Sequence, residues 1–240
     1  MTLPIAAANE RSVTILAEGA TLPGVLAWPT HPSGVVLFAH AGENSRWCSQ
    51  NRLVAGQLGA AGLATLQFDL LAETEASDLS NRFDVESLAR RLIAGIHWVG
   101  GQPEVADLPI GLLGGGIGAA AVLVAAAMAP ESVDAVVSRG GCPDLAGRDL
   151  SRIKAPTLLL VGNRDSRVRS LQAQPLARLT CERQLVVIPG LSQLSEELEA
   201  QEEAAGRAAE WFVRHLAMEP AWRRSHFTPR GSGSPQHATH

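Results

Sequence analysis

Several features that would point to a particular partner or compartment are missing from this sequence. Lysine and arginine number 20 against 24 aspartate and glutamate, and no basic stripe stands out that could follow a phosphate backbone. No stretch reaches the roughly 18 apolar residues that a membrane span needs. The start, MTLPIAAANERSVTI, lacks the charged and apolar regions of a secretion signal. We therefore expect no nucleic acid and no membrane among the partners, and a cytoplasmic location.

Cysteine is also scarce. Cys48, Cys142 and Cys181 are an odd number at wide spacing, which fits neither a disulfide framework nor a CxxC metal pattern. Ordinary buried or half-buried thiols are the expected interpretation. Histidine, cysteine and acidic residues do not cluster at the spacing of metal ligands, so the sequence predicts no metal and no other cofactor.

The chain does contain short β-rich runs that alternate with longer amphipathic or alanine-rich segments. This alternation is typical of a mostly parallel sheet covered by helices, and 240 residues with 46% hydrophobic content suit one sizeable core. Eight strands are expected at residues 12–17, 24–28, 35–40, 64–69, 110–113, 135–138, 157–161 and 184–188. Helices are expected at residues 51–61, 85–99, 117–128, 171–179 and 199–216.

The two ends of the chain differ in character. The first two expected strands precede any helix and are joined by a short turn at residues 19–23, which indicates an antiparallel hairpin at the sheet edge. Residues 219–240 carry three prolines and a Gly-Ser-Gly-Ser run without any periodic apolar pattern. We expect one domain over residues 1–218 and a disordered tail over 219–240.

A glycine-rich turn joins the fifth expected strand to an alanine-rich helix, and two mechanisms fit it. In a nucleophile elbow, G-x-S-x-G, Gly114 and Gly118 would be the flanking glycines and Gly116 the central residue. In a dinucleotide fingerprint, G-x-G-x-x-A, the match is Gly114, Gly116 and Ala119, and amides at the helix start would bind a pyrophosphate. The fingerprint normally follows the first strand of its domain, with an acidic residue about 20 positions on. The position of this turn after the fifth strand favours the elbow.

Four further segments decide between these interpretations. They are VVLFAHAG from Val35, GLATLQFDLL from Gly62, VSRGGCPDL from Val137 and APTLLLVGNRD from Ala155. In this order they resemble bacterial dienelactone-hydrolase-like proteins of the α/β-hydrolase superfamily, over about residues 13–216. The resemblance implies an α/β-hydrolase fold: a mostly parallel eight-stranded sheet with helices on both faces.

The resemblance also implies where a catalytic triad would lie. In the family the elbow reads Gly-Ala-Ser-Thr-Gly, the acid follows the seventh strand, and the histidine follows the eighth within Pro-Gly-x-x-His. Position by position, Asp165 is the acid, but Gly116 replaces the nucleophile and Gln193 replaces the histidine. Glycine has no attacking atom and an amide cannot take a proton near neutral pH. Losing either member typically costs a factor of about 10⁴ to 10⁶ in turnover. Without a histidine to orient, Asp165 could instead cap its loop or pair with Arg139.

The parts that would bind an oxyanion are still present. His40, Ala41 and Gly42 resemble the oxyanion loop after the third strand, and the backbone amide of Ile117 would be the second donor. An anion or a carbonyl oxygen could be held there. The alternative for His40 is a structural role in fixing this loop.

Three residues are candidates for a substitute nucleophile at the carboxyl edge of the sheet: Ser45, Cys48 and Ser192. Cys48 precedes an expected helix, where thiols gain reactivity. Neither Cys48 nor Ser192 has a histidine near it in sequence, and no triad can be assembled. We expect Cys48 to be a packed thiol.

These observations favour a non-hydrolytic member of the family that binds a small molecule or interacts with another protein. The alternative is a hydrolase-family enzyme with weak or non-standard ester, lactone or lyase-type chemistry in the same pocket. Nucleotide binding at the glycine-rich turn is the third hypothesis. The expected partner is a small-molecule ligand or substrate, and the chain is expected to be a monomer or a homodimer.

Overall fold

The computed structural model describes residues 9–40, 48–140, 146, 149–162, 177–191 and 198–217. Its strands are β1 (Asn9–Ala17), β2 (Ala20–Trp28), β3 (Val35–Ala39), β4 (Ala64–Phe68), β5 (Ile110–Gly115), β6 (Ala135–Arg139), β7 (Thr157–Gly162) and β8 (Arg183–Ile188). Its helices are α1 (Ser49–Ala60), α2 (Glu73–Ala76), α3 (Leu79–Phe83), α4 (Val85–Val99), α5 (Ile117–Met128), the short 3-10 helix η3 (Asp149–Arg152) and α7 (Leu198–Leu216).

All eight strands form one sheet in the order β1-β2-β4-β3-β5-β6-β7-β8. The pairs β1/β2 and β2/β4 are antiparallel, and every pair from β4/β3 to β7/β8 is parallel. The prediction of an eight-stranded, mostly parallel sheet is therefore confirmed, with the antiparallel hairpin at one edge. Parallel strands place their carboxyl ends at the same edge, so the residues that follow β3, β5 and β6 are brought together.

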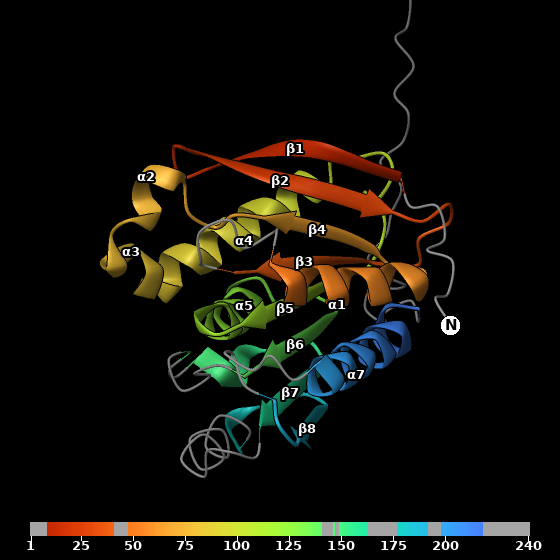
Figure 1. The fold of residues 1–240 in the computed structure, drawn as a ribbon. Coiled ribbons are helices and arrows are strands. Elements are labelled where there is room, and N and C mark those ends of the chain that lie inside the picture. The colour runs from red at the N-terminus through yellow and green to blue at the C-terminus, as the bar shows by residue number, and fades with distance from the viewer. Residues whose placement is uncertain are drawn as a thin grey trace, which may run out of the picture.

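Helices cover both faces of the sheet, as predicted (Figure 1). On one face, α4 and α5 pack against a core that includes Leu37, Leu112 and Val136. On the other face, α1 and α7 cover Phe38, Leu113 and Val137. Neighbouring residues of each central strand thus face opposite sides and are both buried. This explains the nearly continuous apolar runs that identified these strands.

The hairpin turn is tighter than predicted. The expectation was a turn at residues 19–23, but β2 begins at Ala20 and only Glu18 and Gly19 connect the strands. Both residues have positive φ, 50° and 79°. Two-residue loops of this kind match the right-handed twist of paired strands, so the pairing extends to the last residue before the turn. Pro23, taken as a turn residue, lies inside the edge hairpin instead.

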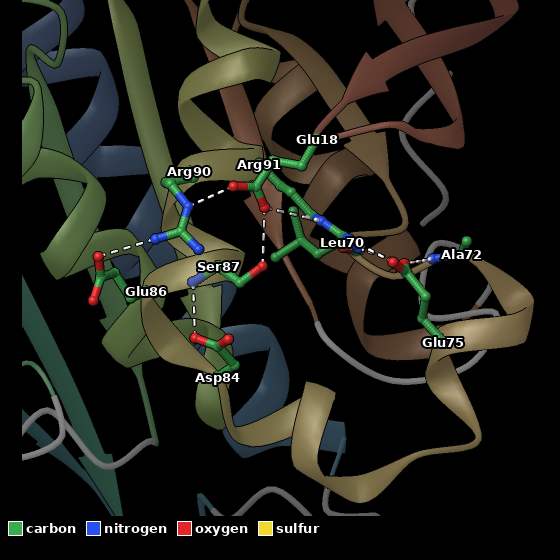
Figure 2. Close-up of polar contacts among 9 residues, drawn as sticks. All are labelled: Glu18, Leu70, Ala72, Glu75, Asp84, Glu86, Ser87, Arg90 and Arg91. Atoms are coloured by element: carbon green, nitrogen blue, oxygen red, sulfur yellow. Dashed lines mark hydrogen bonds and ion pairs between the residues drawn. The ribbon is translucent and has the colours of Figure 1, made fainter.

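A buried arginine ties the hairpin to the segment after β4 (Figure 2). Arg91 on α4 donates to both carboxylate oxygens of Glu75 at 2.6 and 2.7 Å and to the carbonyl of Leu70 at 2.7 Å. Glu18 in the hairpin turn lies 3.7 Å from its Nε and accepts a hydrogen bond from Ser87 at 3.0 Å. We call these residues the Arg91 anchor. It holds four separate stretches of the chain on one side of the sheet.

Other predictions differ from the structure or lie outside its described residues. The helices α2, α3 and η3 were not predicted, because each is too short to show an apolar period. The expected helix 171–179 begins outside the described residues, and the expected tail 219–240 lies wholly outside them. Among the described helices none is long and apolar enough to span a bilayer. The described residues include no group of three or more histidine, cysteine or acidic residues that could hold a metal ion.

Candidate active site

The glycine-rich turn forms a sharp connection between β5 and α5. Gly116 is the single residue between the two elements, with φ 61° and ψ −125°. Side chains rarely adopt this backbone conformation, and a residue other than glycine would be strained there. Gly115, Gly116 and Ile117 are all half-buried, so the bend can be reached from outside.

The flanking glycines are required by close backbone contacts. A Cβ on Gly114 would lie 2.2 Å from the carbonyl oxygen of Gly118, and a Cβ on Gly118 would lie 2.0 Å from the carbonyl oxygen of Ala39. Neither position has room for a side chain. Strand β5, helix α5 and the end of β3 therefore approach as the elbow interpretation requires.

A second close approach lies at the ends of β7 and β8. A Cβ on Gly162, the last residue of β7, would lie 1.8 Å from the carbonyl oxygen of Leu191. The loops that would carry Asp165 and Gln193 therefore begin side by side. Both residues lie outside the described residues, as do Ala41, Gly42, Ser45 and Ser192.

Three neighbouring strands place His40, Gly115 and Arg139 in a row. They follow Phe38, Leu113 and Val137 by two positions, and those three residues share the core beneath α1 and α7. Because side chains alternate along a strand, the later three positions face the same side. Gly115 pairs with Arg139 in the register of β5 and β6. A Cβ on Gly115 would lie 3.7 Å from His40 Cε1 and 3.6 Å from Arg139 Nη2. We call His40, Gly115 and Arg139 the edge row.

Of the residues predicted to bind an oxyanion, His40 and Ile117 lie within the described part of the chain. His40 Nδ1 lies 3.4 Å from Asn51 Nδ2 of helix α1. Burial lowers the pKa of His40 to about 4, and the nearby positive charge of Arg139 lowers it as well. The imidazole is therefore neutral near pH 7. The contact with Asn51 is compatible with the structural role for His40 that was left open above.

Arg139 was named in the sequence only as a possible partner of Asp165, yet it is the one full charge in the edge row. Its exposed fraction is 7%. Nη1 donates to Gln201 Oε1 at 3.2 Å and Nη2 donates to Gln50 Oε1 at 3.3 Å. No carboxylate of the described residues forms an ion pair with it. Burial lowers its pKa, while the neighbouring Cys48 raises it.

Sequence reasoning missed the two glutamine partners altogether. Gln50 lies in the first turn of α1 and Gln201 near the start of α7, about 150 positions apart. One signal in the sequence could have pointed to Arg139 as a buried polar site. It is a charged residue at the end of an otherwise largely apolar strand, Ala135–Arg139.

Cys48 lies at the same edge, as the N-cap of α1. Its sulfur accepts a hydrogen bond from the amide of Asn51 at 3.4 Å, and the residue is half-buried. This contact fits a thiol that packs at a helix start. Of the three candidate substitute nucleophiles, it is the one within the described residues.

Comparisons with known proteins agree with this geometry. The model of the dienelactone hydrolase family matches residues 22–188. A dienelactone hydrolase from Anabaena variabilis is 43% identical, with a TM-score of 0.83 over 87% of this chain and 99% of that one. Est1E from Butyrivibrio proteoclasticus is 15% identical with a TM-score of 0.72; the match covers 86% of this chain and 99% of that chain and shows the shared fold.

Longer relatives are also known. Two Mycobacterium tuberculosis proteins, each named "Putative phosphoribosyl transferase", are 45% identical over 208 residues. The match covers 87% of this chain and 47% of each of those proteins, so the chain spans about half the length of the curated relatives it matches.

Proposed function

Because this chain belongs to the dienelactone hydrolase family, we propose that it keeps the family's pocket at the elbow for binding a small molecule and has lost hydrolysis. The observation that carries this proposal is Gly116 in the bend between β5 and α5, with φ 61° and ψ −125°. In a G-x-S-x-G nucleophile elbow the corresponding residue is the serine whose hydroxyl attacks the acyl carbon. Glycine at this bend relieves the backbone strain and supplies no nucleophile.

The rest of the site supports binding. Ile117 is the first residue of α5, so its amide has no partner within the helix and would be available to an oxygen in the bend, whose three residues are half-buried. Gln193, which corresponds to the family's histidine, has an amide that cannot act as a base near neutral pH. The name of the longer Mycobacterium relatives refers to whole proteins, and we assign no transferase activity to this chain from it.

The direct test is labelling of the purified chain with a fluorophosphonate probe, together with turnover of a short activated acyl ester. We expect neither labelling nor turnover above background. Stoichiometric labelling at a serine of the elbow or its neighbouring loops would contradict the proposal and favour a hydrolase-family enzyme with non-standard chemistry.

Restoration tests the placement of the site. Gly116→Ser combined with Gln193→His should return partial esterase activity, and adding Asp165→Asn should remove most of it. Gly140→Ser is a matched control, because Gly140 also has positive φ, 52°, and a Cβ there would meet nothing within 4 Å. A folded double variant that is no faster than the parent chain would show that these positions do not face one another.

A further inference from the structure

We propose that the ligand of this site carries an oxyanion, a carboxylate or a phosphate, and that the Arg139 guanidinium at the carboxyl end of β6 is its binding partner. The inference rests on the proposed function, because it names the chemical class of the ligand bound there. It is carried by the surroundings of Arg139 in the edge row.

The hydrogen-bond partners of Arg139 do not balance its charge. Arginine is almost never fully buried unless it is paired, because a desolvated cation without a counter-charge is costly. Arg139 is 7% exposed, yet its hydrogen-bond partners in the described structure are the neutral amide oxygens of Gln50 and Gln201. Neither amide carries a charge that offsets the guanidinium. An anionic ligand would supply the missing negative charge.

The Nη2 and Nε edge of the Arg139 guanidinium lies beside Gly115. A guanidinium has five N–H donors in a flat fork, and the two glutamines take one on each Nη. Among the described residues other than the chain neighbours of Gly115, the heavy atoms nearest to its Cβ position are Arg139 Nη2 at 3.6 Å, His40 Cε1 at 3.7 Å and Arg139 Nε at 3.9 Å. Glycine at 115 therefore places no side chain over this edge of the fork. Two parallel N–H donors at this edge match the spacing of two oxygens of a carboxylate or phosphate.

The groups that lie beside Gly115, like Arg139 itself, favour an anion. His40 lies on the other side of Gly115 and is neutral, so it can share a hydrogen bond with an anion without adding a competing charge. The amides at the start of α5 lie beside the same bend and favour negative charge. A cationic ligand would face the guanidinium and is disfavoured. A merely structural Arg139 would link α1 to α7 through the glutamines and would not respond to anions.

The test is a titration of the intact chain with inorganic phosphate and, separately, with acetate, at constant ionic strength. The readouts are calorimetry and the NMR titration of the His40 imidazole. We expect saturable binding at one site and a His40 pKa at least one pH unit higher when the anion is bound, because the anion offsets Arg139. Tighter binding of phosphate would indicate a phosphate ester as the ligand, and tighter binding of acetate a carboxylate.

Variants assign the effect to Arg139. Arg139→Gln should weaken anion binding at least tenfold, and Arg139→Lys, which keeps the charge but not the fork, should retain part of it. Arg183→Gln is the matched control, since Arg183 is exposed at the start of β8. Binding that is unchanged in Arg139→Gln, or a His40 pKa that does not respond to either anion, would overturn the inference. If Arg139→Gln does not fold, the Lys variant and the His40 titration of the parent chain decide the question.

The outcomes separate the two proposals. Failure of anion binding without fluorophosphonate labelling would overturn the anionic ligand and leave the non-hydrolytic site standing. Serine labelling of the parent chain would overturn the proposed function whatever the anion titration shows.

Discussion

Arg91 and Arg139 are both buried arginines at the boundary between the sheet and its helices, but their hydrogen-bond partners differ in charge. Arg91 is 5% exposed and its guanidinium meets two carboxylates and a carbonyl oxygen, so that hydrogen bonding to Glu75 raises its pKa (Figure 2). Arg139 is 7% exposed and meets two amides, and burial lowers its pKa.

The difference indicates two roles for the same residue type. A buried arginine whose charge is matched within the chain can serve to hold distant segments together, as in the Arg91 anchor. A buried arginine that meets no carboxylate among the described residues lowers the stability of the fold. Such costs are typical of positions that serve binding. The following predictions test this contrast.

The largest expected effect is at the anchor. Arg91→Met leaves the carboxylate of Glu75 without its arginine partner and the Leu70 carbonyl without its donor, so it should lower the free energy of unfolding by about 3–5 kcal/mol. Urea denaturation at pH 7 measures this. Arg207→Met on α7, whose exposed side chain pairs with Glu203 and Glu210 away from the anchor, is the control and should cost less than about 1 kcal/mol. Equal costs for the two variants would contradict a structural role for the anchor.

The second effect is a pH dependence specific to the edge row. The folded pKa of His40 is about 4 against an ordinary value of 6.5, so between these values the unfolded chain binds a proton that the folded chain does not. Stability should therefore fall by about 2–3 kcal/mol as the pH drops from 6.5 to 4. In the His40→Gln variant, the free energy of unfolding should not show this part of the fall between pH 6.5 and 4.

Other groups with shifted pKa values are the same in the parent and in His40→Gln, so they do not change the difference between the two proteins. Burial lowers the pKa of His215, which contributes a slope of the same sign in both proteins, so the difference between them isolates His40. Arg91 holds the pKa of Glu75 below its ordinary 4.5, and the anchor therefore loses stability only at lower pH. A slope above pH 4.5 that is identical in the parent and His40→Gln would contradict the assignment.

A smaller contrast concerns the two helix caps. Asp84 caps α4 at the anchor by accepting from the Ser87 amide at 3.0 Å, whereas Cys48 caps α1 at the edge row with a sulfur 3.4 Å from the Asn51 amide. Carboxylates cap helices well and thiols are weak acceptors. Thermal denaturation should show a loss of about 1 kcal/mol for Asp84→Ala and of less than about 0.5 kcal/mol for Cys48→Ala. A larger cost at Cys48 would indicate that its thiol does more than cap.

The smallest effect is expected where the buried charge is unmatched. Arg139→Met removes a desolvated cation and breaks no ion pair with a described residue, so the free energy of unfolding should change by less than about 1 kcal/mol in either direction. Measured beside Arg91→Met in the same denaturant series, it gives the contrast directly. A loss as large as that of Arg91→Met would make Arg139 a structural residue.

The sequence was a good guide to the sheet. The apolar runs at the central strands are buried on both faces, and this burial is what makes them readable without a structure. The elbow was also predictable, because Gly114 and Gly118 have no room for a Cβ and few residue patterns meet that demand. Short helices such as α2 and α3 were not, since α2 is held through Glu75 by Arg91 and α3 is held to α2 by the hydrogen bond from Arg82 to the Ala76 carbonyl.

By itself, the sequence indicated a mostly parallel sheet with a glycine-rich turn after its fifth strand, since periodicity and glycine spacing are local properties, and the resemblance to a known family implied the α/β-hydrolase fold. Only the tertiary structure decided which side chains share the carboxyl edge. His40, Gly115 and Arg139 are separated by up to 99 positions, and strand register alone brings them together. Whether a buried arginine meets a carboxylate or an amide depends on which helices cover it, and no local pattern records that.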